Sequence, residues 1–166
     1  ATRATLEGRG RKILVQGIDG YKDKMIADFR ENKKAILFGV TSFWGGVDVR
    51  GSALSAVIIT KMPFERPDEP INEAMKEFLE RNGRSYFLDH DLPKATMMIR
   101  QGFGRLIRTK SDYGIVALLD SRLNPSSPHY KQYGGGVIKS LPPAKIVSNI
   151  EEVKHFLKKK QKETFK

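Results

Sequence analysis

The amino-acid sequence predicts an α/β fold with a mostly parallel central sheet, because short apolar runs alternate with amphipathic helical segments. The apolar runs are continuous rather than alternating, which is typical of parallel strands that are covered on both faces. The chain has 166 residues, a length that fits one domain or a fragment of a larger protein. Its hydrophobic share of 39% is sufficient for a core.

Four segments carry the pattern of buried strands, at residues 12–16, 35–40, 56–60 and 114–119. The first ends at two glycines, Gly17 and Gly20, which indicate a turn. The second runs directly into a stretch of hydroxyl-bearing and glycine residues. Ligands of open α/β sheets bind at the carboxyl ends of strands, so this stretch is a candidate binding segment.

Two amphipathic helices are expected between these strands. The first follows Gly20 and places Met25, Ile26 and Phe29 on one face. The second ends at Asn82 and Gly83, a helix stop signal. The apolar face of this second helix consists of Ile71, Ala74, Met75, Phe78 and Leu79.

A third helix is expected at about residues 149–163, after Pro142 and Pro143. Ser148 and Glu151 have the spacing of a capping box at its start. Lysines 158–160 lie at its end, where cations suit the helix dipole. We favour a solvated helix end for these lysines over a specific DNA contact. The apolar stripe of the helix consists of Ile150, Val153, Phe156 and Leu157.

The charge balance is strongly basic, with 30 Lys and Arg against 19 Asp and Glu and a net charge of +11. Such a charge favours an anionic partner such as nucleic acid, although it also serves solubility. The sequence has no cysteine, which excludes disulfides, thiolate zinc sites and iron–sulfur ligation in this segment. No apolar run has the length of a membrane span, so no membrane partner and a cytoplasmic location are expected.

No metal site is expected in this chain. Asp89, His90 and Asp91 are adjacent in sequence, so their side chains cannot easily converge on one ion. His129 and His155 are isolated in the sequence.

The most informative segment is QGFGRLIR at residues 101–108. On a helix, Gln101, Arg105 and Arg108 share one face because they are spaced by four and three residues. Two neighbouring guanidiniums repel each other unless an anion lies near them, and their planar donors match phosphate oxygens. A surface helix with salt-bridged arginines is the alternative interpretation. The opposite face would be core and consists of Ile99, Phe103, Leu106 and Ile107.

This segment resembles motif VI of superfamily 2 helicases, Q-x-x-G-R-x-x-R. The resemblance implies that Arg105 and Arg108 contact the phosphates of an ATP bound to another motor domain, one of them as an arginine finger. It implies that Gln101 positions the nucleotide or the attacking water, and that Gly104 lies at the nucleotide. A guanidinium placed in trans stabilises charge on the transferring phosphoryl group.

The second informative segment, TSFWGGVDVRG at residues 41–51, follows the second predicted strand. It is similar to the S-F-W-E-G-V-D motif V of DinG-type helicases. The resemblance implies DNA contacts for Thr41, Ser42, Trp44 and Arg50, and a place near the nucleotide for Gly46 and Asp48. From the residues alone, Trp44 and Phe43 suit either base stacking or the core, and we favour the core for Phe43.

Two residues depart from the motif V pattern. Gly45 stands where the family has Glu, and Arg50 stands where it has Pro. Loss of the carboxylate weakens the expectation that ATP hydrolysis is coupled to DNA contact. Arg50 is a candidate phosphate contact in its place.

Further matches to DinG/XPD-type helicases run in the family's order from Ile13 to Pro142. The resemblance implies a three-layer α/β/α RecA-like domain, the second of two motor domains, with an opening strand that belongs before Ala1. The matching connectors are ILVQG at 13–17, VIITKMPF at 57–64, LPKA at 92–95, DYG at 112–114, LDSR at 119–122, YG at 133–134 and SLP at 140–142.

The sequence therefore predicts the second motor domain of an ATP-dependent DNA helicase that moves on single-stranded DNA, in a bacterial, nucleoid-associated DNA repair setting. No P-loop and no D-E-x-H motif occur in the chain, so ATP and Mg²⁺ are expected to be held by an N-terminal RecA-like domain of the same parent. The chain alone is expected to be inactive. The alternative is a basic RecA-like module that binds single-stranded nucleic acid without coupled ATPase activity.

Overall fold

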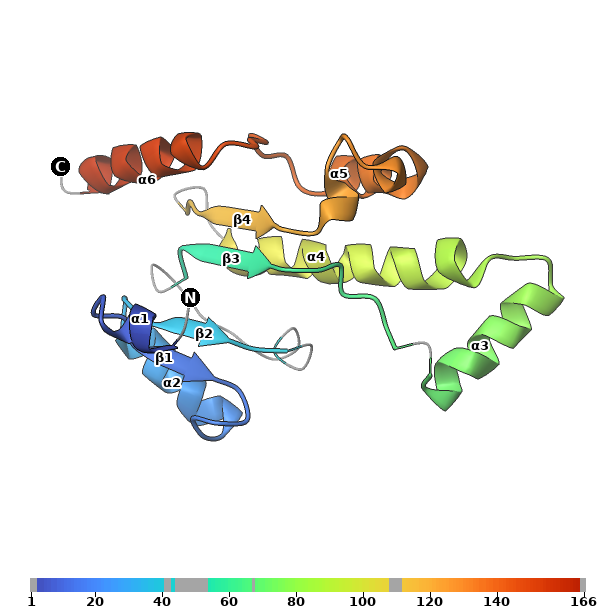
Figure 1. The fold of residues 1–166 in the computed structure, drawn as a ribbon, viewed down its shortest axis with the longest axis horizontal. Coiled ribbons are helices and arrows are strands. Elements are labelled where there is room, and N and C mark those ends of the chain that lie inside the picture. Colours follow the sequence, from blue (N-terminus) through green and yellow to red (C-terminus); the bar gives the residue numbers. More distant parts are fainter. Residues whose placement is uncertain (1–2, 41–42, 44–53, 67, 108–111, 165–166) are drawn as a thin grey trace.

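In the computed structural model of the 166-residue chain, the described residues form four short strands and a larger number of helical segments (Figure 1). It describes residues 3–40, 43, 54–66, 68–107 and 112–164, with the side chains described as far as residue 160. All four predicted strands are present within two residues of their expected ends, and the predicted α/β class is confirmed. The strands are β1 (Ile13–Val15), β2 (Ile36–Phe38), β3 (Ala56–Ile59) and β4 (Ile115–Leu118).

The strands pair in parallel, as expected, but they form two separate two-stranded sheets. β1 pairs with β2 so that Ile13 lies opposite Ile36, and β3 pairs with β4 so that Ala56 lies opposite Ile115. Helix α2 connects the first pair, and helices α3 and α4 connect the second (Figure 1). Such crossovers are the usual connection between parallel strands. The expectation that both faces are covered is wrong for part of β3, because Ile58 is 64% exposed.

Helix α2 (Lys22–Glu31) covers the first pair of strands. Its predicted apolar face is confirmed, since Met25, Ile26 and Phe29 are buried against Leu14. The turn before it uses Gly17 and Gly20, which have φ values of 81° and 113°. These left-handed conformations are readily adopted by glycine and are costly for other residues.

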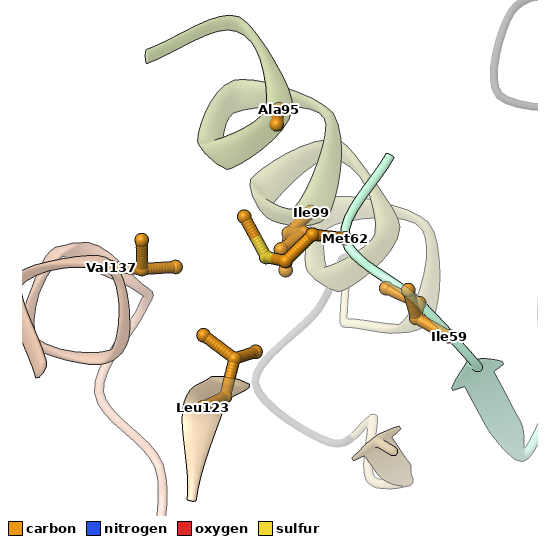
Figure 2. Close-up of a cluster of buried hydrophobic side chains, with 6 residues drawn as sticks. All are labelled: Ile59, Met62, Ala95, Ile99, Leu123 and Val137. Carbon is orange, nitrogen blue, oxygen red and sulfur yellow. The ribbon is translucent and has the colours of Figure 1, made fainter. Parts of the chain in front are cut away.

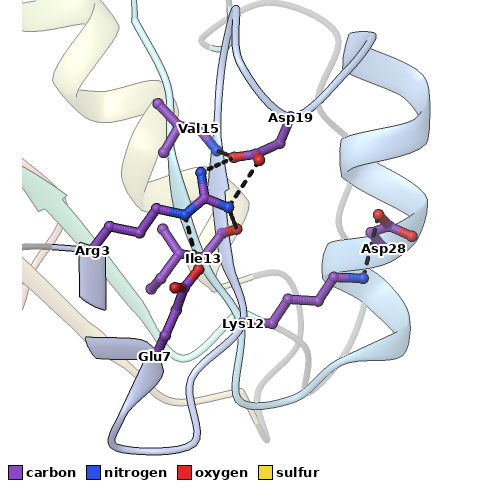
Figure 3. Close-up of polar contacts among 7 residues, drawn as sticks. All are labelled: Arg3, Glu7, Lys12, Ile13, Val15, Asp19 and Asp28. Atoms are coloured by element: carbon purple, nitrogen blue, oxygen red, sulfur yellow. Dashed lines mark hydrogen bonds and ion pairs between the residues drawn. The ribbon is translucent and has the colours of Figure 1, made fainter. Parts of the chain in front are cut away.

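A polar network holds the N-terminal helix α1 (Arg3–Glu7) to the turn after β1 (Figure 3). The Arg3 guanidinium donates to both carboxylate oxygens of Asp19, at 3.0 and 2.9 Å, and to Glu7 at 2.8 Å. The backbone amide of Val15 also donates to Asp19, at 2.7 Å. These hydrogen bonds, that from Arg3 above all, lower the pKa of the Asp19 carboxyl.

The larger core lies between the second pair of strands, α4 (Leu92–Leu106) and α5 (Gly135–Ser140) (Figure 2). Asp120, which follows β4, lies at the edge of this core and binds through its carboxylate. It accepts from the Met62 amide at 2.7 Å and from the Arg122 side chain at 2.9 and 2.6 Å, so Asp120 and Arg122 have a structural role. The buried residues of this core are Ile59, Met62, Ala95, Ile99, Leu123 and Val137.

Helix α3 (Pro70–Arg81) ends as predicted, with Asn82 as its cap and Gly83 at φ 67°. Much of its predicted apolar face is uncovered, since Ile71 is 73% and Phe78 is 61% exposed. Only Leu79, at the border of that face, and Asn72 are buried on this helix.

The predicted C-terminal helix is confirmed as α6 (Ile150–Thr164). Its start differs from the expected capping box, because the helix begins at Ile150 and the Asn149 side chain accepts from the Glu151 amide at 2.8 Å. Asn149, rather than Ser148, is therefore the capping residue. Within the described residues, no helix combines the length and the apolar character that crossing a membrane requires.

Candidate functional site

Helix α4 carries the first six residues of the QGFGRLIR segment, and its inner face is buried in the core. Pro93 lies in the first turn, where a missing amide hydrogen has no helical partner to lose. Ala95 and Ile99 are 1% and 0% exposed, and Gly102 and Leu106 are buried on the same side. These contacts with β3 and β4 determine which face of α4 is turned away from the core.

Gln101 and Arg105 are four residues apart on α4 and therefore share one face of it. Gln101 is exposed, whereas Arg105 is partly buried and its Nε atom lies out of contact with solvent. Phe103 lies between them in sequence and packs against the core cluster. The expected division into a polar face and a core face holds for Gln101, Phe103 and Leu106, whereas Arg105 is partly buried.

The helix ends before the second arginine of the segment. Leu106 is the last helical residue, and Ile107 has extended backbone angles of −117° and 111°. Ile107 is 45% exposed, so its predicted place in the core is wrong, because the chain leaves the helix there to return toward β4. Arg108 lies outside the described residues, and α4 does not extend to it as the single-helix prediction required.

Gly104 is exposed on α4, with open space beside it. A Cβ atom placed on Gly104 would meet no heavy atom within 4 Å, apart from its own helix backbone and neighbours. Packing within the described chain therefore does not require a glycine here, although glycine costs helix stability relative to alanine by about 1 kcal/mol.

Gly114, by contrast, is in close contact with the end of α4. A Cβ atom on Gly114 would lie 2.5 Å from Cδ1 and 2.7 Å from Cγ of Leu106, well inside contact distance. The start of β4 can therefore lie against the last turn of α4 because Gly114 has no side chain. This role of Gly114 was not predicted from the sequence, where its only signal was the DYG segment that follows the arginines.

The second informative segment lies mostly beyond what the structure describes. Thr41, Ser42, Trp44, Gly46, Asp48 and Arg50 are all outside the described residues. Phe43 is described, and it packs against the buried cluster of Leu14, Met25, Ile26 and Phe29. The core placement favoured for Phe43 is therefore confirmed. A Cβ atom on Gly39 would lie 2.8 Å from its ring, so the end of the β2 segment is closely fitted to it.

Asp89, His90 and Asp91 contact different polar partners. Asp89 accepts from the Ser85 amide at 3.0 Å, while Asp91 accepts from the Glu65 amide at 3.2 Å. His90 lies 3.7 Å from Glu65. Burial raises the pKa of the Asp91 carboxyl. Among the residues whose placement is described, no three His, Cys, Asp or Glu side chains are grouped to hold a metal ion.

Comparison with known protein families decides the class of this chain. The model of the helicase C-terminal domain matches residues 1–144. The chain belongs to the helicase C-terminal domain family. This membership confirms the RecA-like fold class and the resemblance drawn from the QGFGRLIR and TSFWGGVDVRG segments.

Relatives of this helicase C-terminal domain are found in several bacteria. The ATP-dependent DNA helicase YoaA of Haemophilus influenzae is 40% identical over 148 residues, which are 89% of this chain and 22% of that protein. The ATP-dependent helicase DinG of Mycobacterium tuberculosis is 35% identical over 159 residues, 96% of this chain and 23% of that protein. The 3'-5' exonuclease DinG of Bacillus subtilis is 34% identical over 142 residues, which are 85% of this chain and 15% of that protein.

This helicase C-terminal domain therefore spans between 15% and 23% of the length of these relatives. The match to the family includes all of α4 but ends before α6, which begins at Ile150. Gln101 and Arg105 thus lie within the family match, whereas the C-terminal helix lies outside it.

Proposed function

We propose that this domain is the second RecA-like motor domain of an ATP-dependent DNA helicase that translocates on single-stranded DNA. In this proposal, Gln101, Arg105 and Arg108 face an ATP that is held by the N-terminal RecA-like domain of the same parent chain. The observation that carries it is the placement of Gln101 and Arg105 on one side of α4, while Ile99 and Leu106 anchor the other side in the core.

The chemistry assigned to these residues is electrostatic. ATP with Mg²⁺, held by the other domain, supplies the phosphoryl group that is transferred to water. Arg105 and Arg108 offer N–H donors to its phosphate oxygens and stabilise the charge that develops there. The Gln101 amide can both donate and accept, which suits it to orient the nucleotide or the attacking water. These donor groups fit a triphosphate.

Single-stranded DNA is the proposed polymer substrate. Thr41, Ser42, Trp44 and Arg50 are its proposed contacts, and Gly46 and Asp48 are proposed to lie near the nucleotide. Support comes from the position of this segment after β2 and from the net charge of +11. The relatives named as ATP-dependent DNA helicases support the same assignment.

A second candidate function is single-stranded nucleic-acid binding without coupled ATP hydrolysis. The observation that favours it is Gly45, which replaces the carboxylate of the family motif. The two functions differ in what DNA does to ATP turnover, because a coupled motor is stimulated by DNA and a passive module is not.

The test compares arginine variants of the parent protein. Arg105→Ala and Arg108→Ala are expected to lower the kcat of DNA-stimulated ATP hydrolysis by at least about a hundredfold and to leave the Kd for single-stranded DNA nearly unchanged. Arg100→Ala is the matched control, since Arg100 is an exposed arginine on another side of α4. Equal turnover in all three variants would exclude the arginine-finger role. Wild-type turnover that DNA does not stimulate would favour the binding module.

A further inference from the structure

Two side chains of the C-terminal helix α6 contact the ring of Tyr113. The ring of Phe156 meets the ring of Tyr113 edge to face, with centroids 6.3 Å apart and planes at 80°. The ammonium group of Lys160 lies 5.9 Å from the centre of the same ring. Edge-to-face pairs and cations over aromatic rings are both favourable at such distances. One turn of α6 therefore contacts Tyr113 from two positions.

Tyr113 is the residue before Gly114, whose close contact with Leu106 joins β4 to the last turn of α4. Leu106 in turn is the residue after Arg105. Contacts thus run without interruption from α6 through Tyr113 and Gly114 to the arginine-bearing end of α4. In Figure 1, α6 lies on the same side of the molecule as the start of β4.

The lysines of α6 do not all have the same surroundings. Lys158 and Lys159 are exposed, and within the described part of the chain they have no acidic partner. Lys160 is partly buried and lies over Tyr113. The solvated helix end favoured from the sequence therefore describes Lys158 and Lys159, but not Lys160.

We propose that α6 is a brace for the arginine-bearing end of α4, and that Phe156 and Lys160 are positioning residues that act through Tyr113. This inference rests on the proposed function, because it concerns the placement of Arg105 against ATP. It goes beyond the motif residues of the proposed function, since Phe156 and Lys160 lie after residue 144, where the family match ends.

The physical reason for such a brace is the sensitivity of transition-state stabilisation to geometry. α4 ends at Leu106, directly after Arg105, and Ile107 is already extended. A guanidinium displaced by about 1 Å from the transferring phosphoryl group can cost orders of magnitude in rate. Fixing Tyr113 limits the movement of Gly114 and of the Leu106 turn, which carries Arg105.

The experiment uses the full-length parent protein and separates kcat from KM. Phe156→Ala is expected to lower the kcat of DNA-stimulated ATP hydrolysis by about three- to tenfold, the effect of losing one aromatic pair. The KM for ATP and the Kd for single-stranded DNA are expected to change by less than about twofold. Ile150→Ala is the matched control, because Ile150 is a 64% exposed apolar residue of the same helix. It is expected to keep the wild-type kcat.

Two further variants test the route of action. Tyr113→Phe keeps the ring and is expected to retain most of the turnover, whereas Tyr113→Ala is expected to lower it as Phe156→Ala does. The double variant Tyr113→Ala with Phe156→Ala should lose no more than the worse single variant, since both remove one contact. The brace would be overturned if the double variant lowered kcat by the product of the two single effects. It would also be overturned if Phe156→Ala had the same kcat as Ile150→Ala.

Failure of the brace is distinguishable from failure of the proposed function. Arg105→Ala, measured in the same assay, reports on the function itself. If Arg105→Ala abolishes turnover while Phe156→Ala does not change it, the proposed function stands and the brace is wrong. If Arg105→Ala has no effect, the proposed function is wrong, and the brace falls with it.

Discussion

The carboxylate of Asp120 accepts a hydrogen bond of 2.7 Å from the backbone amide of Met62, a residue 58 positions earlier in the chain. This bond joins the end of the β4 segment to the loop after β3. Asp120 also accepts from the amide and side chain of Arg122, and its side chain is only 6% exposed. The carboxylate therefore satisfies several donors at the edge of the larger core.

Asp120→Ala is expected to lower the free energy of unfolding by about 2–3 kcal/mol, because it leaves a buried amide and a guanidinium without their acceptor. Urea denaturation measures the change. Asp68→Ala is the matched control, since the Arg66–Asp68 ion pair is largely exposed, with side chains at 77% and 64%. Its expected change is below about 0.5 kcal/mol. Equal losses in the two variants would contradict the role of Asp120.

The same carboxylate predicts a pH dependence. Hydrogen bonds from Arg122 hold the pKa of Asp120 well below its usual range. A lowered folded-state pKa contributes stability that is present above the unfolded value of about 3.9 and is lost as the pH falls through the folded value. The wild-type chain is therefore expected to lose stability below about pH 4. Asp120→Asn should lose less free energy of unfolding over that pH range. If its stability fell with pH as steeply as that of the wild type, Asp120 would be excluded as the source of the pH dependence.

Gly114→Ala is expected to lower the free energy of unfolding by about 1–3 kcal/mol, because its Cβ atom would overlap the Leu106 side chain. The double variant with Leu106→Ala should lose less free energy of unfolding than the sum of the two single losses, since Leu106→Ala removes the overlapping atoms. Double-mutant denaturation measures the coupling. Strict additivity would show that the two positions do not interact.

Gly104→Ala is expected to stabilise the chain by about 0.5–1 kcal/mol, because the site is helical and open. Thermal unfolding measures this effect. In the parent protein, the KM for ATP separates two interpretations of Gly104. A raised KM would indicate that the nucleotide approaches the helix backbone there, and an unchanged KM would leave Gly104 without a role in binding.

Ile99→Ala is expected to destabilise the chain by about 2–5 kcal/mol, because Ile99 is fully buried and anchors α4 in the larger core. Met97→Ala is the control on the same helix, since Met97 is 54% exposed. Its expected effect on urea denaturation is below about 1 kcal/mol. Similar losses in both variants would contradict the assigned orientation of α4.

Periodicity predicted the secondary structure well, because strands and helices depend on local patterns. The burial of Met25, Ile26 and Phe29 follows from their spacing, and so does the turn at Gly17 and Gly20. The exposure of Ile71 and Phe78 did not follow from it. An apolar stripe shows which face of a helix prefers burial, but whether another element covers that face depends on the rest of the fold.

For the candidate site, the spacing of Gln101 and Arg105 was enough to place them on one helical face. The end of the helix at Leu106 was not predictable in this way, because QGFGRLIR carries no stop signal before Arg108. The chain leaves the helix there because it must pass Gly114 and enter β4, a requirement set by residues that lie eight positions further on.

By itself, the sequence determined the α/β class, the parallel strands and the helicase family of this domain, since these depend on local periodicity and on motifs of fixed spacing. Only the tertiary structure decided where α4 ends, how Gly114 meets Leu106 and that α6 rests on Tyr113. Those relationships join residues that are distant in the chain, and their geometry depends on how whole elements pack, which no local pattern encodes.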